Sequence, residues 1–136
     1  MTQTLLVQDL MTRSPHTIEV SKTLAAVKRV MKKRGVRHLP VVDEGALVGL
    51  ISERDVELVE SLSSRDATEI GLVEAMSRAP WTVAPSAPLE IAARHMARHK
   101  LGSSVVVDNG KVVGIFTSTD ALRALAQLLA EARPAP

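Results

Sequence analysis

The sequence contains no cysteine and no tyrosine, and it has only one tryptophan and one phenylalanine. The lack of cysteine excludes disulfide bonds and thiolate metal sites, and it fits a reducing compartment. No apolar run approaches the roughly 18 residues that a membrane-spanning helix requires, and no secretory leader pattern opens the chain. We therefore expect a cytoplasmic protein with no membrane partner.

Neither sign of charge dominates, because the 17 basic and 15 acidic residues leave a net charge of only +2. The 46% hydrophobic and 24% charged content is typical of a globular protein. Positive charge is concentrated between Lys28 and Arg37. A solvated helix face with cations near its C-terminal end explains this segment. Nucleic-acid binding by Lys28–Arg37 is an alternative, less favoured function, and it predicts an affinity that falls steeply with salt.

The chain contains an internal repeat, because residues 7–56 align with residues 72–121 at a constant offset of 65 positions without a gap. Such a duplication predicts two copies of one supersecondary unit about a pseudo-two-fold axis. A unit of about 50 residues is marginal alone, so we expect the two to share one core. The expected division is a first repeat at 1–62, a connector at 63–71 and a second repeat at 72–136.

Hydrophobic periodicity changes in the same order in both repeats. The pattern predicts short strands at 17–20 and 82–83, amphipathic helices from Leu24 and Leu89, hairpins at 38–51 and 103–116, and final helices from Glu53 and Ser118. We expect Ser21 and Ser86 to cap the first helices and Gly35 to end one of them. Short leading helices are expected at 7–11 and 72–76. Each repeat is thus β-α-β-β-α, an α/β (α+β) fold whose repeats pack sheet to sheet.

The histidines do not indicate catalysis or metal binding. His95 and His99 have the four-residue spacing that two metal ligands on a helix need, but no Glu, Asp or Cys nearby completes a shell. His16 and His38 lack an evident nucleophile. We therefore expect no metal site and no enzyme activity.

The segment with most chemical content is the junction between the last strand and the last helix. Both copies read Gly, two apolar residues, a hydroxyl residue, two variable residues and Asp, at 49–55 and 114–120. Hydroxyl and acid at this spacing form a capping box, which is a purely structural interpretation. A carboxylate at a helix start can equally accept two hydrogen bonds from a ribose diol.

The two junctions, the element order and the RHLPVVD segment resemble a tandem pair of CBS domains, the Bateman module, over residues 7–124. The resemblance implies regulatory binding of AMP, ADP or ATP, or of S-adenosylmethionine, in clefts between the paired repeats, without a required cofactor; magnesium is left open as a companion of the nucleotide. It places the ribose on Asp55 and Asp120 beside Ser52 and Thr117. The further nucleotide-binding candidates that it implies are Thr17, Ile18, Val36, Arg37, His38, Pro40, Thr82, Val83, Leu101, Ser103 and Thr119.

The repeats differ where a phosphate would bind, since Arg37-His38 in the first corresponds to Gly102-Ser103 in the second. We therefore expect unequal sites. If the phosphate ligands serve the opposite repeat, the site with Thr117, Thr119 and Asp120 is the better furnished. Trp81 precedes Thr82 and is a candidate for stacking on the base, although ordinary packing also explains it.

The expected partners are an adenosine-containing small molecule, a second copy of the chain in a homodimer formed through the helices, and a separate, unidentified regulated protein. A scaffold for oligomerisation that binds no ligand is the other alternative. An enzyme acting on nucleotide phosphate is the least favoured.

Overall fold

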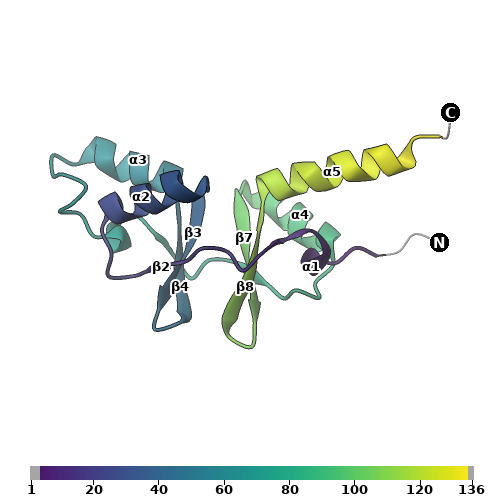
Figure 1. Ribbon diagram of the computed structural model, residues 1–136, viewed down its shortest axis with the longest axis horizontal. Helices are drawn as coiled ribbons and strands as arrows, with labels where there is room; N and C mark the ends of the chain where they lie inside the picture. The colour runs from purple at the N-terminus through teal and green to yellow at the C-terminus, as the bar shows by residue number, and fades with distance from the viewer. Residues whose placement is uncertain (1–3, 135–136) are drawn as a thin grey trace. The chain divides into compact units, whose positions relative to one another are not determined.

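The computed structural model describes residues 4–134, and its ribbon is shown in Figure 1. The chain divides into two compact units. Unit one comprises the N-terminal residues as far as Ser14, Trp81–Asn109 and the chain from Val113 onward. Unit two comprises Pro15–Pro80 and Gly110–Val112. Both units are mixed α+β, as the sequence predicts.

Unit two contains a four-stranded sheet with the order β2-β3-β4-β5. Its elements are β2 (Ile18–Glu19), α2 (Leu24–Arg34), β3 (His38–Asp43), β4 (Ala46–Ser52), α3 (Glu53–Leu62), the 3-10 helix η1 (Leu72–Glu74) and β5 (Ser77–Arg78). Strand β2 is parallel to β3, whereas β3, β4 and β5 are antiparallel neighbours. The predicted order of strand, helix, hairpin and helix is confirmed.

Unit one repeats this architecture with the sheet order β1-β8-β7-β6. Its elements are α1 (Val7–Leu10), β1 (Thr12–Arg13), β6 (Thr82–Val83), α4 (Leu89–His99), β7 (Ser103–Asp108), β8 (Lys111–Thr117) and α5 (Ser118–Ala132). Helix α5 is five residues longer than α3, which has 10 residues against its 15.

The leading segments of the two repeats are exchanged between the units. Strand β1 comes from the first repeat but pairs with β8, where Thr12 is opposite Ile115. Strand β5 comes from the second repeat but pairs with β4, where Leu50 is opposite Ser77. These two-residue strands were not expected from the sequence. The division at 1–62, 63–71 and 72–136 therefore stays a prediction about sequence repeats, and the packing units follow different boundaries.

A glycine lies where each exchanged strand pairs with the sheet, at Gly114 opposite β1 and at Gly49 opposite β5. A Cβ atom on Gly49 would lie 2.6 Å from Sδ of Met76 and 2.9 Å from the backbone oxygen of Ser77. A Cβ atom on Gly114 would overlap Met11. Each glycine thus leaves room for the methionine that precedes the exchanged strand.

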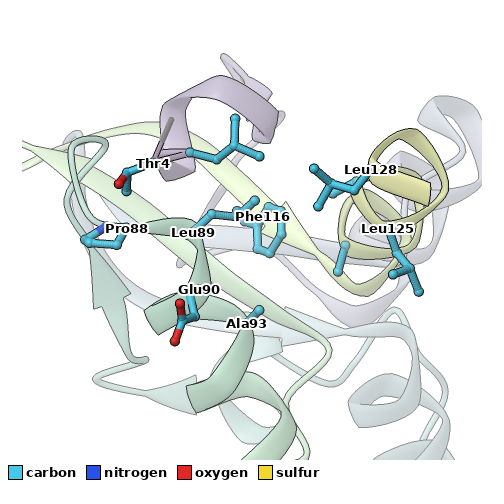
Figure 2. Close-up of a pocket in the computed structure, with 11 residues that line it drawn as sticks. Thr4, Pro88, Leu89, Glu90, Ala93, Phe116, Leu125 and Leu128 are labelled. Atoms are coloured by element: carbon cyan, nitrogen blue, oxygen red, sulfur yellow. The ribbon is translucent and has the colours of Figure 1, made fainter. Parts of the chain in front are cut away.

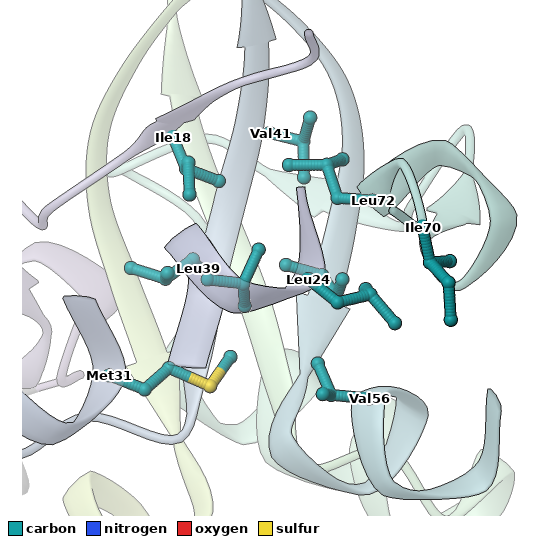
Figure 3. Packing of buried hydrophobic residues seen from close by; sticks show 10 residues of the cluster. Ile18, Leu24, Met31, Leu39, Val41, Val56, Ile70 and Leu72 are labelled. Atoms are coloured by element: carbon teal, nitrogen blue, oxygen red, sulfur yellow. The ribbon is translucent and has the colours of Figure 1, made fainter. Parts of the chain in front are cut away.

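Each unit has its own cluster of buried apolar residues, and the expectation of one core shared by both repeats stays a prediction. In unit two, helix α2 contributes Leu24, Val27 and Met31, which pack against Leu39 and Ile51 of the sheet (Figure 3). The cluster of unit one is built in the same way around α4 and β7, with Phe116 at 1% exposure. The exchanged segments complete both clusters, because Val7 and Leu72 are fully buried.

The helix ends differ in part from the expected ones. Helix α2 is capped by Thr23, whose hydroxyl accepts from the Ala26 N–H, and α4 follows Pro88. The prediction of Ser21 and Ser86 as caps is therefore wrong, because both lie two residues too early. Gly35 does end α2 in the left-handed conformation, with φ of 65°.

Candidate functional site: two unequal strand-to-helix junctions

The junction of unit two is formed where β4 ends and α3 begins. The Ser52 hydroxyl accepts from the Asp55 N–H at 3.1 Å, and the Ser52 N–H donates to Oδ2 of Asp55 at 2.8 Å. The capping-box interpretation is thus confirmed here. These bonds fix the rotamer of Asp55, because the side chain is tied to the first turn of its own helix.

Two basic residues lie next to this junction. His38 begins β3 and is opposite Ser52 in the antiparallel register. The Arg37 carbonyl accepts from the Glu53 N–H at 2.9 Å, which holds the residue before β3 against the first turn of α3. Arg37, His38, Ser52 and Asp55 therefore all belong to one junction of one unit.

Burial sets the charge state of His38. It lowers the pKa of the imidazole below its usual value of 6.5, although the carboxylate of Asp55 raises it and Arg37 lowers it further. The side chain is thus mostly neutral at pH 7.5 and gains its proton as the pH falls. Arg37 is exposed.

The Asp55 carboxylate keeps one oxygen for a ligand. Its side chain is only partly buried, and Oδ2 carries the bond from Ser52. Among the described residues of unit two, no donor reaches Oδ1. An unused carboxylate oxygen can accept hydrogen bonds from a diol, while the neighbouring Arg37 and His38 can bind an anion.

The junction of unit one has the same capping box but is closed. The Thr117 hydroxyl and N–H contact Oδ2 of Asp120 at 3.1 and 2.9 Å, and the Asp120 N–H donates to the Thr117 hydroxyl at 3.1 Å. In addition, the Thr12 hydroxyl donates to Oδ1 and Oδ2 of Asp120 at 3.1 and 3.2 Å. Arg123 approaches Oδ1 at 3.5 Å, and Asp120 is only 5% exposed. Every oxygen of this carboxylate already has a partner.

The two basic residues of the first junction have no counterparts here. Gly102 and Ser103 occupy the positions that correspond to Arg37 and His38 of unit two. The Gly102 carbonyl accepts from the Ser118 N–H at 2.9 Å, so the backbone contact is preserved. The hydroxyls of Ser103 and Ser104 are buried and have no hydrogen-bond partner among the described residues. Thr119, the further phosphate candidate, is exposed on the first turn of α5.

The residues proposed for the base are divided between core and surface. Ile18, Val83 and Pro40 are buried, whereas Thr17 and Thr82 are exposed. Val36 packs against the cluster of unit two, and Leu101 is 36% exposed. These roles stay predictions.

Trp81 already has an aromatic partner. Its ring stacks on His95 with a centroid distance of 3.7 Å and an interplanar angle of 18°, and His95 is followed by His99 at 4.3 Å. Burial of His95, together with the neighbouring His99 and Arg98, lowers the pKa of this imidazole. Any stacking on a base would have to use the other face of the indole or replace this contact.

Sequence reasoning missed the residues that close the second junction. Thr12 reaches Asp120 only because the leading strand is exchanged, and no local pattern signals a contact across 108 positions. Arg123 could have been found, because residues three apart share a helix face.

The paired helices of each unit enclose a surface groove. The groove of unit one, about 490 Å³, is lined mainly by apolar side chains of α4 and α5, with Phe116 at its floor (Figure 2). The groove of unit two, about 570 Å³, is lined by charged residues of α2 and α3. There Lys28 and Glu60 form an ion pair at 3.1 Å, so part of the basic segment is already neutralised.

Residues 4–134 contain no cluster of three or more His, Cys, Asp or Glu side chains in reach of one metal ion. None of the helices between these limits combines the length and the apolar character needed to cross a membrane.

Comparison with known proteins decides the family. The CBS domain model matches the chain twice, at residues 7–58 and 68–127. The chain belongs to the CBS domain family. It is 32% identical over 114 residues to the CBS domain-containing protein YhcV of Bacillus subtilis, covering 84% of this chain and 81% of that protein.

Solved CBS pairs have the same fold. The CBS domain pair of MJ0100 in complex with 5-methylthioadenosine and S-adenosyl-L-methionine superimposes with a TM-score of 0.82 at 29% identity, over 93% of this chain and 99% of that one. CBSX2 of Arabidopsis thaliana in complex with AMP gives a TM-score of 0.76 at 30% identity, over 91% and 98%. Longer curated relatives with enzyme names are matched over only 23% of their length. The chain is therefore a CBS domain pair, a module that also occurs as a small part of larger enzymes.

Proposed function

We propose that this CBS pair is a regulatory module that binds an adenosine nucleotide, with the Ser52–Asp55 junction of unit two as its principal site. The observation that carries the proposal is the partly exposed Asp55 carboxylate, whose Oδ1 has no donor within the described part of unit two. Asp55 accepts the ribose diol, and Arg37 with His38 holds the phosphate. The complexes of MJ0100 and CBSX2 with adenosine-containing ligands support this ligand class.

Regulation would follow from differential affinity. A bound nucleotide can shift the protein between two arrangements only by as much as its affinities for them differ. A separate protein would then sense that shift as a report of energy state. The ligand series AMP, ADP, ATP and S-adenosylmethionine, each with and without magnesium, identifies which molecule produces it.

Calorimetric titration with AMP tests the assignment. Asp55→Asn keeps an oxygen that can still accept the Ser52 N–H, so the helix cap survives while the charge is lost. We expect AMP to bind this variant about 10- to 100-fold more weakly, the scale of a charge-assisted hydrogen bond of about 1.5–3 kcal/mol. Asp120→Asn is the matched control and should leave the affinity of the principal site unchanged.

A second comparison isolates the phosphate. Adenosine lacks the group that Arg37 would bind, so Arg37→Ala should weaken AMP binding and leave adenosine binding unchanged. Equal losses for both ligands, or full AMP affinity in Asp55→Asn, would contradict the proposed site. Absence of AMP binding to nucleotide-free wild type would favour the scaffold alternative.

We also propose that the protein forms a homodimer through its helices. Helix α5 exposes four leucines that its own unit leaves uncovered: Leu122, Leu125, Leu128 and Leu129, at 66%, 51%, 44% and 61% exposure. Their spacing forms an apolar stripe along the helix. Leu125 and Leu128 also line the apolar groove of unit one (Figure 2). Light scattering of wild type and Leu125→Glu measures the oligomeric state.

A further inference from the structure

The Thr12 hydroxyl contacts both oxygens of the Asp120 carboxylate, at 3.1 and 3.2 Å. Thr12 lies in β1, which reaches this position only because the leading segment of the first repeat pairs with β8. The contact is therefore not part of the capping box, which Thr117 already completes. It adds a donor from 108 positions away at the place where a ribose diol would have to bind.

The equivalent residue in unit two makes no such contact. Strand β5 places Ser77 opposite Leu50, just as β1 places Thr12 opposite Ile115. Ser77 carries a hydroxyl like Thr12, but within the described part of unit two it forms no hydrogen bond with Asp55. The burial follows the contacts, because Asp120 is 5% exposed and Asp55 is only partly buried.

We propose that Thr12 is a specificity-determining residue, which closes the Asp120 junction to ribose and directs the adenosine ligand to Asp55. The inference rests on the proposed function and adds to it that the adenosine ligand occupies the Asp55 junction in preference to the Asp120 junction. A diol that takes Asp120 must first break the Thr12 bond, so the exchange yields no net gain of hydrogen bonds. A diol that takes Asp55 uses an oxygen that is still available.

Charge acts in the same direction. Asp120 is paired with Arg123 at 3.5 Å, and the positions of Arg37 and His38 are occupied here by Gly102 and Ser103. The basic residues that can bind a nucleotide phosphate, Arg37 and His38, therefore lie at the Asp55 junction. Opening the Asp120 junction should admit the nucleoside part of a ligand without adding affinity for its phosphate.

The test is the stoichiometry of AMP and adenosine binding to Thr12→Val, measured by calorimetry on the full chain. Valine keeps the shape and the strand preference of threonine but cannot donate. We expect wild type to bind one AMP per chain and Thr12→Val to bind two. The new site should bind adenosine about as well as AMP and should gain about tenfold or more in affinity over wild type.

Three variants make the result specific. Thr12→Ser keeps a hydroxyl and should behave as wild type, which excludes a general effect of changing β1. Ser77→Ala changes the matched position of unit two and should leave one site with unchanged affinity. Adding Asp120→Asn to Thr12→Val should remove the second site again.

The outcomes separate this inference from the proposed function. One site in both wild type and Thr12→Val, lost in Asp55→Asn, would overturn the role of Thr12 and leave the proposed function intact. Two sites in wild type, one of them lost in Asp120→Asn, would also overturn it. No AMP binding to any of the chains would overturn both.

Discussion

The junctions at 49–55 and 114–120 have the same sequence pattern and the same capping box, but their carboxylates are in different states. Asp55 is held by Ser52 alone within its unit and remains partly exposed. Asp120 also receives Thr12 and Arg123 and is buried. The pattern therefore specifies how the helix begins, whereas the residues contributed from elsewhere decide whether the carboxylate is available for a ligand.

The strands β3 and β7, which lie beside the strands that end at the junctions, differ as well. Leu39 is completely buried in the cluster of unit two, and its counterpart 65 positions later is Ser104, also completely buried. The leucine fills its site with apolar atoms, while the Ser104 hydroxyl has no partner among the described residues. One unit thus gains stability at a position where the other loses some of it.

This difference gives the largest expected effect on stability. Leu39→Ala should lower the free energy of unfolding by about 2–5 kcal/mol, because it removes buried methyl groups and leaves a cavity. Ser104→Ala should leave the free energy unchanged or raise it by about 1 kcal/mol, since it removes a buried hydroxyl that forms no hydrogen bond. Urea unfolding followed by circular dichroism measures both. A large loss in Ser104→Ala would mean that the hydroxyl has a partner in solution, such as a buried water.

The glycines at the exchanged strands sharpen the comparison with a smaller effect. A methyl group on Gly49 meets Sδ of Met76 at 2.6 Å and the backbone oxygen of Ser77 at 2.9 Å. The three atoms nearest to a methyl group on Gly114 all belong to the side chain of Met11, which is flexible and can move aside. We expect Gly49→Ala to destabilise the protein by about 1–3 kcal/mol and Gly114→Ala by less.

Thermal unfolding of the two glycine variants decides this point. In the double variant Gly114→Ala, Met11→Ala the collision is removed, so the part of the loss due to overlap should disappear. The double variant Gly49→Ala, Met76→Ala should stay destabilised, because the backbone of Ser77 remains. Equal losses at Gly49 and Gly114 would show that β1 and β5 adapt equally well.

The fold was largely predictable from local patterns. Helix α2 follows from the apolar spacing of Leu24, Val27 and Met31, and its end follows from Gly35. The capping boxes follow from hydroxyl and acid three residues apart. The prediction of Ser21 and Ser86 as caps was wrong, because more than one residue near each helix start can occupy the N-cap position. The protein uses Thr23 and Pro88 there.

The candidate site was predictable only as a list of side chains. The sequence indicates Asp55 and Asp120 as equals, since it shows the same pattern twice. Their difference depends on the exchange of β1 and β5, which are two-residue strands without a periodicity of their own. The contact of Thr12 with Asp120 depends on the packing of a whole segment, so no residue near Asp120 in the sequence predicts it.

The smallest expected effect is the pH dependence of AMP binding. It distinguishes the two junctions, because only the Asp55 junction has a histidine, His38, where the other has Ser103. Burial lowers the pKa of His38 below 6.5. In the free protein the unfolded chain therefore takes up the proton more readily, and stability falls as the pH drops below 6.5.

A bound phosphate favours the protonated imidazole, so AMP affinity should rise between pH 8 and 6.5, by at most about tenfold. The phosphate itself is about half protonated at about pH 6, and this loss of charge opposes the rise and ends the useful range. In His38→Gln the rise should disappear, whereas His16→Gln should keep it. A rise that persists in His38→Gln would mean that the phosphate does not lie at the Asp55 junction, and it would remove the electrostatic half of the difference between the two units.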